Sequence, residues 1–280
     1  MEIKFAKMHG LGNDFMVLDL VSQAFEFTPD HIRQWSDRRT GIGFDQLLII
    51  EPPQQPDADF NYRIYNADGS PAEQCGNGAR CVAKFIADLP LSIKPNIVLQ
   101  TSTGRIETRL LDPDTVEVDM GPPLLAAQEV PFCVAKAVSC GHPSFTLAAL
   151  DEEFEITPVS MGNPHGVIFV DDIVTTRVAE IGAALTSHDF FPQRANIGFC
   201  QIIDSGFVRL RVFERGVGET RACGTGACAA AVAGRLLGKL ADRVKVSLPG
   251  GKIRIHWQGG DSPVKLTGSA TFVYEGRLAA

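Results

Sequence analysis

The sequence predicts an α+β fold made of two duplicated halves, each a mostly antiparallel sheet or barrel around one central helix. Three observations lead to this prediction. The chain repeats itself after about 150 residues, strand-like segments outnumber helical ones, and 27 glycines and 17 prolines among 280 residues imply many turns. The 45% hydrophobic content is sufficient for a large core. An all-helical bundle is disfavoured.

The repeat keeps its spacing over several motifs. A shift of 148 residues aligns Tyr62-Arg-Ile-Tyr-Asn66 with Leu210-Arg-Val-Phe-Glu214, and a Cys-Gly-X-Gly-Ala motif follows nine residues later in both places. Further pairs in the same order are Gly12-Asn13 with Gly162-Asn163, and Ile42-Gly-Phe-Asp-Gln46 with Ile197-Gly-Phe-Cys-Gln201. We therefore expect a first half at 1–121, joined by a C-terminal strand at 266–280, and a second half at 122–265.

The elements follow from local patterns. Thr28-Pro29 is typical of a helix start and predicts a helix to about Arg39, which Gly41 ends. Each Cys-Gly-X-Gly motif is followed by a helical pattern, and the small apolar run after the second motif predicts a helix buried on nearly all faces. The expected helices are Ala79–Asp88 and Ala227–Leu237; the expected strands are Phe60–Tyr65, Ile97–Gln100, Arg105–Leu110, Val208–Phe213 and Val244–Leu248.

The cysteines point to the chemistry. Seven cysteines without a C-x-x-C pair are typical of a reduced protein. Cys75 and Cys223 each stand where a helix begins, and free N–H groups at a helix start lower the pKa of a thiol and bind anions. We interpret these two as reactive and the others as inert core or surface thiols: Cys81, Cys133, Cys140, Cys200 and Cys228.

Duplication has a chemical consequence for two such thiols. Two equivalent groups on opposite sides of one carbon could remove a proton from one face and return a proton to the other. That arrangement inverts configuration, which a hydrolase triad does not do. The sequence therefore predicts a two-base racemase or epimerase.

The motifs resemble those of the diaminopimelate epimerase family over nearly the whole chain. The most specific are His9-Gly-Leu-Gly-Asn-Asp-Phe15, Asn66-Ala-Asp-Gly-Ser70, Gln74-Cys-Gly-Asn-Gly-Ala-Arg-Cys81, Met161-Gly-Asn-Pro-His165, Glu214-Arg-Gly-Val-Gly-Glu-Thr220 and Ala222-Cys-Gly-Thr-Gly-Ala227. The resemblance implies the fold of that family, no cofactor and no metal. It also implies interconversion of LL- and meso-diaminopimelate, a step in the biosynthesis of lysine and peptidoglycan precursors.

The resemblance assigns roles residue by residue. Cys75 and Cys223 become the acid/base thiols, with His165 and Glu214 beside them. Tyr274 is placed at the interface of a homodimer. Gly198 departs from the more polar residue expected there. The substrate would be held by Asn13, Gln46, Asn66, Gly76, Asn77, Asn163, Asn196, Glu214, Arg215, Gly224 and Thr225.

Other functions remain open at this point. A proline or hydroxyproline racemase of the same superfamily is the first alternative, although proline has no distal head group for so many amides and Arg215. A thiol redox sensor or metal-binding module is the second, although the cysteine spacings suit zinc poorly. No lysine stands out for pyridoxal phosphate. The formal charge of −7 argues against a nucleic-acid partner, and we expect a cytoplasmic protein without a signal or membrane segment.

Overall fold

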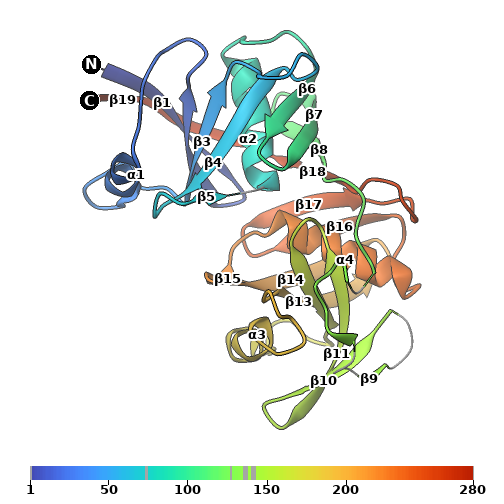
Figure 1. Ribbon diagram of the computed structural model, residues 1–280. Coiled ribbons are helices and arrows are strands. Elements are labelled where there is room, and N and C mark those ends of the chain that lie inside the picture. The colour runs from blue at the N-terminus through green and yellow to red at the C-terminus, as the bar shows by residue number, and fades with distance from the viewer. Residues whose placement is uncertain (1, 73–74, 127, 135–137, 140–142, 280) are drawn as a thin grey trace. The chain divides into compact units, whose positions relative to one another are not determined.

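The N-terminal strand β1 (Glu2–Gly10) is paired antiparallel on both edges, with β2 (Asn13–Asp19) and with β19 (Thr271–Ala279) from the far end of the sequence. Figure 1 shows β1 and β19 running side by side. The computed structural model describes every residue except 1, 73–74, 127, 135–137, 140–142 and 280. Gln74 of the quoted motif and the thiol of Cys140, which we predicted to be inert, lie outside the described residues.

The chain divides into two compact units. Unit 1 comprises Met1–Asp119 with Thr267–Ala280, and unit 2 comprises Met120–Leu266. The remaining elements of unit 1 are α1 (Pro29–Ser36), β3 (Gln46–Glu51), β4 (Phe60–Asn66), β5 (Pro71–Ala72), α2 (Gly76–Asp88), β6 (Asn96–Thr101), β7 (Gly104–Asp112) and β8 (Thr115–Asp119). The division falls within β18 (Lys265–Ser269).

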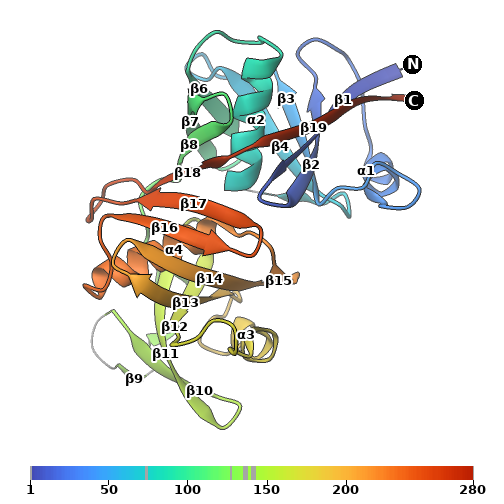
Figure 2. The same cartoon turned by 180° about the vertical axis from the view of Figure 1, so that it is seen from behind.

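Unit 1 is a curved sheet around α2. Pairing gives the strand order β19, β1, β2, β3, β4, β6, β7, β8, antiparallel except for β2–β3 and β4–β6. Helix α2 contacts strands from both ends of this order, β1 and β19 as well as β7 and β8, so the sheet bends around it (Figure 2). The predicted central helix of the first half is confirmed.

Unit 2 repeats this topology. Its elements are β9 (Val138–Ser139), β10 (Phe145–Ala149), β11 (Glu152–Ser160), β12 (Pro164–Phe169), α3 (Val178–Thr186), β13 (Asn196–Asp204), β14 (Phe207–Glu214), β15 (Gly218–Thr220), α4 (Gly224–Leu236), β16 (Arg243–Leu248) and β17 (Gly251–His256). The parallel pairs β12–β13 and β14–β16 correspond to β2–β3 and β4–β6. The predicted duplication is therefore confirmed.

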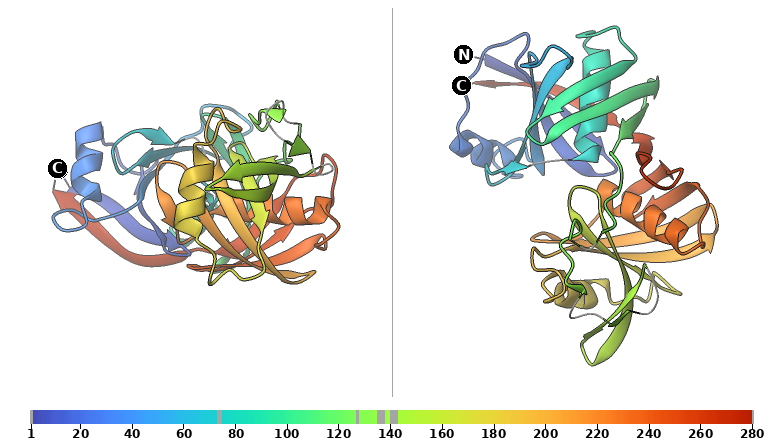
Figure 3. Two further views of the ribbon diagram at one scale, coloured as in Figure 1. Left: turned by 90° about the horizontal axis from the view of Figure 1, so that it is seen from below. Right: turned by 45° about the vertical axis from the view of Figure 1, so that its right-hand side comes forward.

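Helix α4 occupies the place of α2 in the second unit. It contacts β11, β12, β13, β14 and β17, and its residues Gly224–Gly234 are all buried. The right-hand view of Figure 3 shows it in orange against the strands of its own unit. The prediction of a helix buried on nearly all faces is confirmed, because alanine and glycine leave room for strands to approach closely.

A second helix covers the outer face of each sheet. Ile32 and Trp35 of α1 join a core with Met16, Leu18 and Leu47, whereas Val17 and Leu48 are buried on the other side. With both faces covered, β2 and β3 read as continuous apolar runs instead of alternating ones. The equivalent helix α3 covers β13 and β14.

The predicted strands are all present within two residues of their expected ends, but helix bounds differ. Helix α1 ends at Ser36 instead of Arg39, because the Asp37 carboxylate accepts hydrogen bonds from the backbone N–H groups of Arg39 and Thr40 and starts a turn. Both central helices begin three residues earlier than predicted, directly after Cys75 and Cys223. No described helix is both long and apolar enough to cross a membrane.

Candidate active site

Cys75 caps the N-terminus of α2. Its backbone is extended, with φ of −146°, and its Sγ accepts a hydrogen bond of 3.3 Å from the N–H of Gly78. The side chain is half-buried. A Cβ atom on Gly78 would collide with the hydroxyl of Tyr62, so glycine is needed there for the helix start to approach the sheet. The sulfur therefore lies at the positive end of the helix dipole.

Amide side chains surround this thiol. The Oδ1 of Asn13 accepts from the Cys75 thiol over 3.8 Å and from the Nδ2 of Asn77 over 3.2 Å. A guanidinium nitrogen of Arg80 donates to the Oδ1 of Asn77 over 2.9 Å. Gly76, the first residue of α2, has no side chain that could crowd the thiol. Three of the predicted site residues are thus in mutual contact.

Gln46 and Asn66 form a second polar pair in unit 1. They face each other across β3 and β4, and the Nε2 of Gln46 donates to the Oδ1 of Asn66 over 3.0 Å. The Nδ2 of Asn66 donates to the Ser70 hydroxyl over 3.1 Å. Both amides are therefore ordered by side-chain contacts and not by backbone turns.

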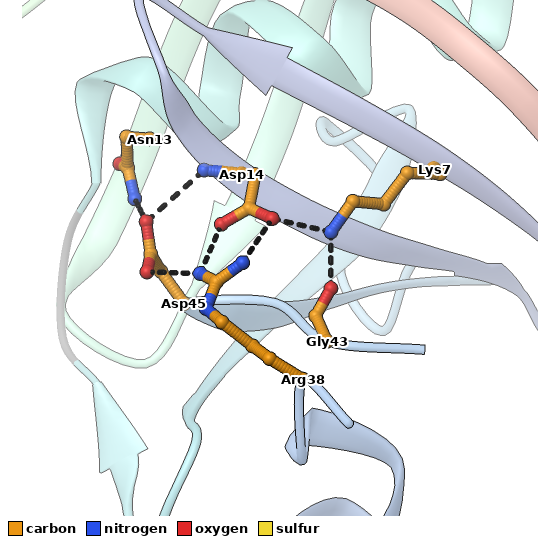
Figure 4. Close-up of polar contacts among 6 residues, drawn as sticks. All are labelled: Lys7, Asn13, Asp14, Arg38, Gly43 and Asp45. Carbon is orange, nitrogen blue, oxygen red and sulfur yellow. Dashed lines mark hydrogen bonds and ion pairs between the residues drawn. The ribbon is translucent and has the colours of Figure 1, made fainter. Parts of the chain in front are cut away.

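A charged cluster that the sequence did not reveal lies behind Asn13 (Figure 4). Asp14 accepts from Lys7 and from both terminal nitrogens of Arg38, while Asp45 accepts from Arg38 and from the Nδ2 of Asn13. Burial alone would raise the pKa of Asp14, but hydrogen bonds from Arg38 and Lys7 outweigh it and lower that pKa to about 2. Asp14 is therefore ionised at any physiological pH.

Cys223 caps the N-terminus of α4 in the same extended conformation, with φ of −123°. It is only 4% exposed, and the Thr225 hydroxyl lies 3.6 Å from its sulfur. Burial first, and the nearby charge of Glu214 second, raise the pKa of the Cys223 thiol well above its ordinary value. The expectation that a helix start lowers the pKa of both thiols is wrong for Cys223, because desolvation outweighs the hydrogen bonds from Thr225 and Gly226.

His165 and Asn163 continue the polar chain from Thr225. The Nδ2 of Asn163 donates to the Thr225 hydroxyl over 3.3 Å, and its Oδ1 lies 3.1 Å from the Nε2 of His165. The imidazole is fully buried, and burial, with a smaller contribution from the charge of Arg215, lowers its pKa to about 3. His165 is therefore neutral, with the proton on Nε2.

Glu214 ends β14, at the place that Asn66 occupies at the end of β4. Its carboxylate accepts a hydrogen bond from the Thr220 hydroxyl and interacts with the Cys223 thiol. Thr220 belongs to a quoted motif but was not predicted as a site residue. The side-chain amide oxygen of Asn196 accepts from the N–H of Arg215 over 2.9 Å, which fixes the loop that follows β14.

Sequence comparison decides the family. The family model of diaminopimelate epimerase matches residues 5–126 and 157–273. The chain is 53% identical to the diaminopimelate epimerase of Pseudomonas aeruginosa and 51% identical to that of Stutzerimonas stutzeri, each over 278 residues and 99% of both chains. This protein belongs to the diaminopimelate epimerase family.

Solved structures with much lower identity share the epimerase fold. A hydroxyproline epimerase from Agrobacterium vitis matches with a TM-score of 0.72 at 16% identity, covering 99% of this chain and 92% of that one. A phenazine biosynthesis protein of the PhzF family from Bacillus anthracis matches with a TM-score of 0.68 at 12% identity, covering 100% of both chains. The predicted epimerase-like fold is confirmed.

The remaining site predictions for this epimerase concern the start of α4 and Tyr274. Gly224 and Thr225 open α4 beside Cys223, as Gly76 and Asn77 open α2 beside Cys75. Tyr274 of β19 is 43% exposed and its ring packs edge-on against Phe5, with centroids 6.1 Å apart. Across the described part of the chain, no three metal-ligating side chains come together.

Proposed function

We propose that this protein catalyses the interconversion of LL- and meso-diaminopimelate by proton transfer at the α-carbon, without a cofactor. The observation that carries the proposal is the identity of 53% over 278 residues to an enzyme named diaminopimelate epimerase. Within that framework each unit contributes one cysteine at a helix start, in the same motif and the same backbone conformation.

The two thiols exchange protons with the substrate. One sulfur, as thiolate, accepts the α-proton, and the electron pair of the broken C–H bond stays on the carbon, delocalised toward the adjacent carboxylate. The other thiol then gives its S–H proton to the opposite face of the carbon. Each turnover leaves the two sulfurs with exchanged protonation, so each is the acceptor for one isomer and the donor for the other.

The chain's other groups stabilise this transfer. The free N–H groups at the N-termini of α2 and α4 stabilise negative charge that develops on the substrate. Asn163, Thr225 and Glu214 set the protonation of Cys223 through the contacts described above. The substrate has two amino-acid ends, for which we propose the binding residues Asn13, Gln46, Asn66, Gly76, Asn77, Asn163, Asn196, Glu214, Arg215, Gly224 and Thr225.

A solvent-exchange experiment tests the proposal. LL-diaminopimelate is incubated with the protein in deuterated buffer without added cofactor, and the products are separated by chirality and mass. We expect the meso isomer with one deuterium at an α-carbon. Absence of exchange would overturn the proposal, and exchange into proline or hydroxyproline in its place would favour a racemase of those substrates.

We also propose a homodimer with Tyr274 at its interface. The 43% exposure of Tyr274 supports the assignment, because large aromatic side chains are enriched in protein interfaces. Light scattering after size-exclusion chromatography is expected to give twice the 30.2 kDa chain mass, and Tyr274→Ala is expected to give a monomer. Val174→Ala, which removes an exposed side chain of unit 2, is the control and leaves the mass unchanged.

We propose the cytoplasm as the site of action, within the biosynthesis of lysine and of peptidoglycan precursors. No disulfide bond joins any of the six described cysteines, which suits a reducing compartment. Growth of a strain lacking its own epimerase, with and without supplied meso-diaminopimelate, tests this role. Complementation by this gene is expected, and dependence on supplied meso-diaminopimelate despite expression would contradict it.

A further inference from the structure

Asp45 makes a direct contact with the amide that faces Cys75. One carboxylate oxygen of Asp45 accepts from the Nδ2 of Asn13 over 2.9 Å and from the backbone N–H of Asp14 over 3.1 Å. These two donors come from the first two residues of β2, next to the turn that precedes it. Asp45 therefore holds the NH₂ end of the Asn13 side chain (Figure 4). The oxygen end of the same amide accepts from the Cys75 thiol.

Arg38 anchors Asp45 in turn. Its Nη2 donates to the other oxygen of Asp45 over 2.8 Å and to Asp14 over 2.7 Å. Asp14 is itself bound to Lys7, which also donates to the carbonyl oxygen of Gly43. Charge-assisted hydrogen bonds of this kind are stronger and more directional than neutral ones, so the carboxylate of Asp45 has a fixed position although its side chain is partly exposed.

A charged residue, Arg80, also fixes the orientation of Asn77, the second amide that is bonded to Asn13. Arg80 donates to the oxygen of Asn77, which leaves the Nδ2 of Asn77 to donate to the oxygen of Asn13. An amide has donors at one end and acceptors at the other. Only one orientation of Asn13 satisfies both Asp45 and Asn77, and that orientation presents a carbonyl oxygen to the thiol of Cys75.

The second unit provides an internal comparison. Strand pairing aligns Asn196 with Gln46, because His165 pairs with Asn196 as Phe15 pairs with Gln46. The residue at the place of Asp45 is therefore Ala195, which is buried and has no side chain that can accept a hydrogen bond. There Asn163, the counterpart of Asn13, donates its Nδ2 to Thr225, the counterpart of Asn77. The hydrogen bond between the paired positions therefore runs in the opposite direction where the carboxylate is missing.

We propose that Asp45 is a positioning residue: anchored by Arg38, it locks the Asn13 amide with its oxygen on the Cys75 thiol and so stabilises the S–H form of that cysteine. The inference rests on the proposed role of Cys75 and adds the group that controls its protonation. With alanine at position 45 the acceptor for Asn13 is lost. The Asn13 amide then turns and donates to the sulfur, which stabilises the thiolate.

The rate of Cys75 alkylation by iodoacetamide measures this effect without substrate. Only the thiolate reacts, so the pH dependence of the rate reports the thiol pKa, and peptide mapping separates Cys75 from the other cysteines. We expect Asp45→Ala to raise the rate constant at pH 7 about fivefold to tenfold and to move the midpoint to lower pH. Arg38→Gln, which leaves Asp45 in place without its anchor, is expected to act in the same direction by a smaller factor.

A matched control and a double mutant separate positioning from charge and from damage to the fold. Asp59 is also an aspartate of unit 1 that accepts from a lysine, Lys94, and from a backbone N–H, that of Val98, and it belongs to none of the contacts around Cys75. Asp59→Ala is expected to leave Cys75 alkylation unchanged. In an Asn13→Ala background, Asp45→Ala is expected to have no further effect.

Two results would overturn the inference. An unchanged Cys75 rate in both Asp45→Ala and Arg38→Gln would show that the carboxylate does not act on the thiol. An undiminished effect of Asp45→Ala in the Asn13→Ala background would show that its charge acts directly through space. Failure of the proposed function is a separate outcome, since it is measured as missing deuterium exchange with the wild-type protein.

Discussion

The Thr225 hydroxyl lies 3.6 Å from the sulfur of Cys223, with the side-chain amide of Asn163 bonded to the same oxygen. Because Asn163 donates a hydrogen bond to that oxygen, the hydroxyl hydrogen of Thr225 can point at the sulfur. This contact lowers the pKa of Cys223 against the larger opposing effects of burial and Glu214. The Thr225 hydroxyl thus favours the thiolate of this cysteine.

Removing this hydroxyl should slow epimerisation. We expect Thr225→Val to reduce kcat about tenfold, because the thiolate of Cys223 loses a donor. In the direction in which Cys223 is the base, the acid limb of the pH-rate profile is expected to move to higher pH. Thr225→Ser keeps the hydroxyl and is expected to retain most of the activity. Equal loss in both variants would argue that the methyl group, and not the hydroxyl, matters.

Both proposed thiols should be indispensable. Cys75→Ala and Cys223→Ala are each expected to reduce epimerisation to background, whereas the free energy of unfolding changes by only about 1 kcal/mol because a single small group is removed. Cys81→Ala and Cys228→Ala serve as controls in α2 and α4 and should keep their activity per folded molecule. An active Cys75→Ala enzyme would exclude the two-thiol mechanism.

His165 should make stability depend on pH. Its pKa is lowered from the ordinary 6.5 to about 3, so between these values the unfolded chain binds one proton that the folded chain does not. The stabilisation is complete above pH 6.5 and is lost as pH falls toward 3. The free energy of unfolding of the wild type and of His165→Gln is measured with urea between pH 5 and 7.5 and plotted against pH. At the acid end of this range the slopes of the two plots are expected to differ by the equivalent of about one proton. Parallel curves would contradict the buried neutral state.

Breaking the charged cluster of unit 1 should destabilise the fold more than breaking an exposed ion pair. We expect Asp14→Asn to lower the free energy of unfolding by about 2 kcal/mol, because the nearly buried Lys7 loses its carboxylate. Glu152→Gln removes an exposed pair with Arg177 and is expected to cost less than about 0.5 kcal/mol. Urea titration followed by tryptophan fluorescence makes the comparison, and equal costs would contradict it.

Two glycines of unit 2 should respond differently to a methyl group. A Cβ on Gly182 would collide with the ring of Phe213, so Gly182→Ala is expected to destabilise the packing of α3 on β14 by about 2 kcal/mol. At Gly198 the nearest atom to a Cβ is 3.5 Å away, on Leu210, so Gly198→Ala is expected to be tolerated. Thermal unfolding of both variants tests this pair.

The sequence predicted those elements whose signal is local or repeated. Alternating strands, the two central helices and the duplication were correctly expected from patterns within a few residues and from the match between halves. Helix α3 was missed because Arg177 at its start makes no side-chain cap and Gly182 weakens its helical pattern. The early starts of α2 and α4 were missed because Gly-X-Gly has low helix propensity. Close packing of these buried residues overrides that propensity in both helices, and in α2 the side-chain cap from Cys75 adds to it.

The same limit applies to the site. Cysteines at helix starts were predictable, since the repeat marks both. The contact of Asp45 with Asp14 and Asn13 joins residues about 30 positions apart, and no spacing rule connects them. The raised pKa of Cys223 follows from burial by several strands, which no local pattern expresses.

Because β1 pairs with β19, the sheet of unit 1 can be completed only near the end of translation. Translation produces β1 first, but its partner β19 follows only after every residue of unit 2. At roughly 5–20 residues per second, β1 has an open edge for a period on the order of tens of seconds. During this time the open edge of β1 must not pair with another strand. Unit 1, whose first residues are made earliest, is therefore the unit whose sheet is completed last.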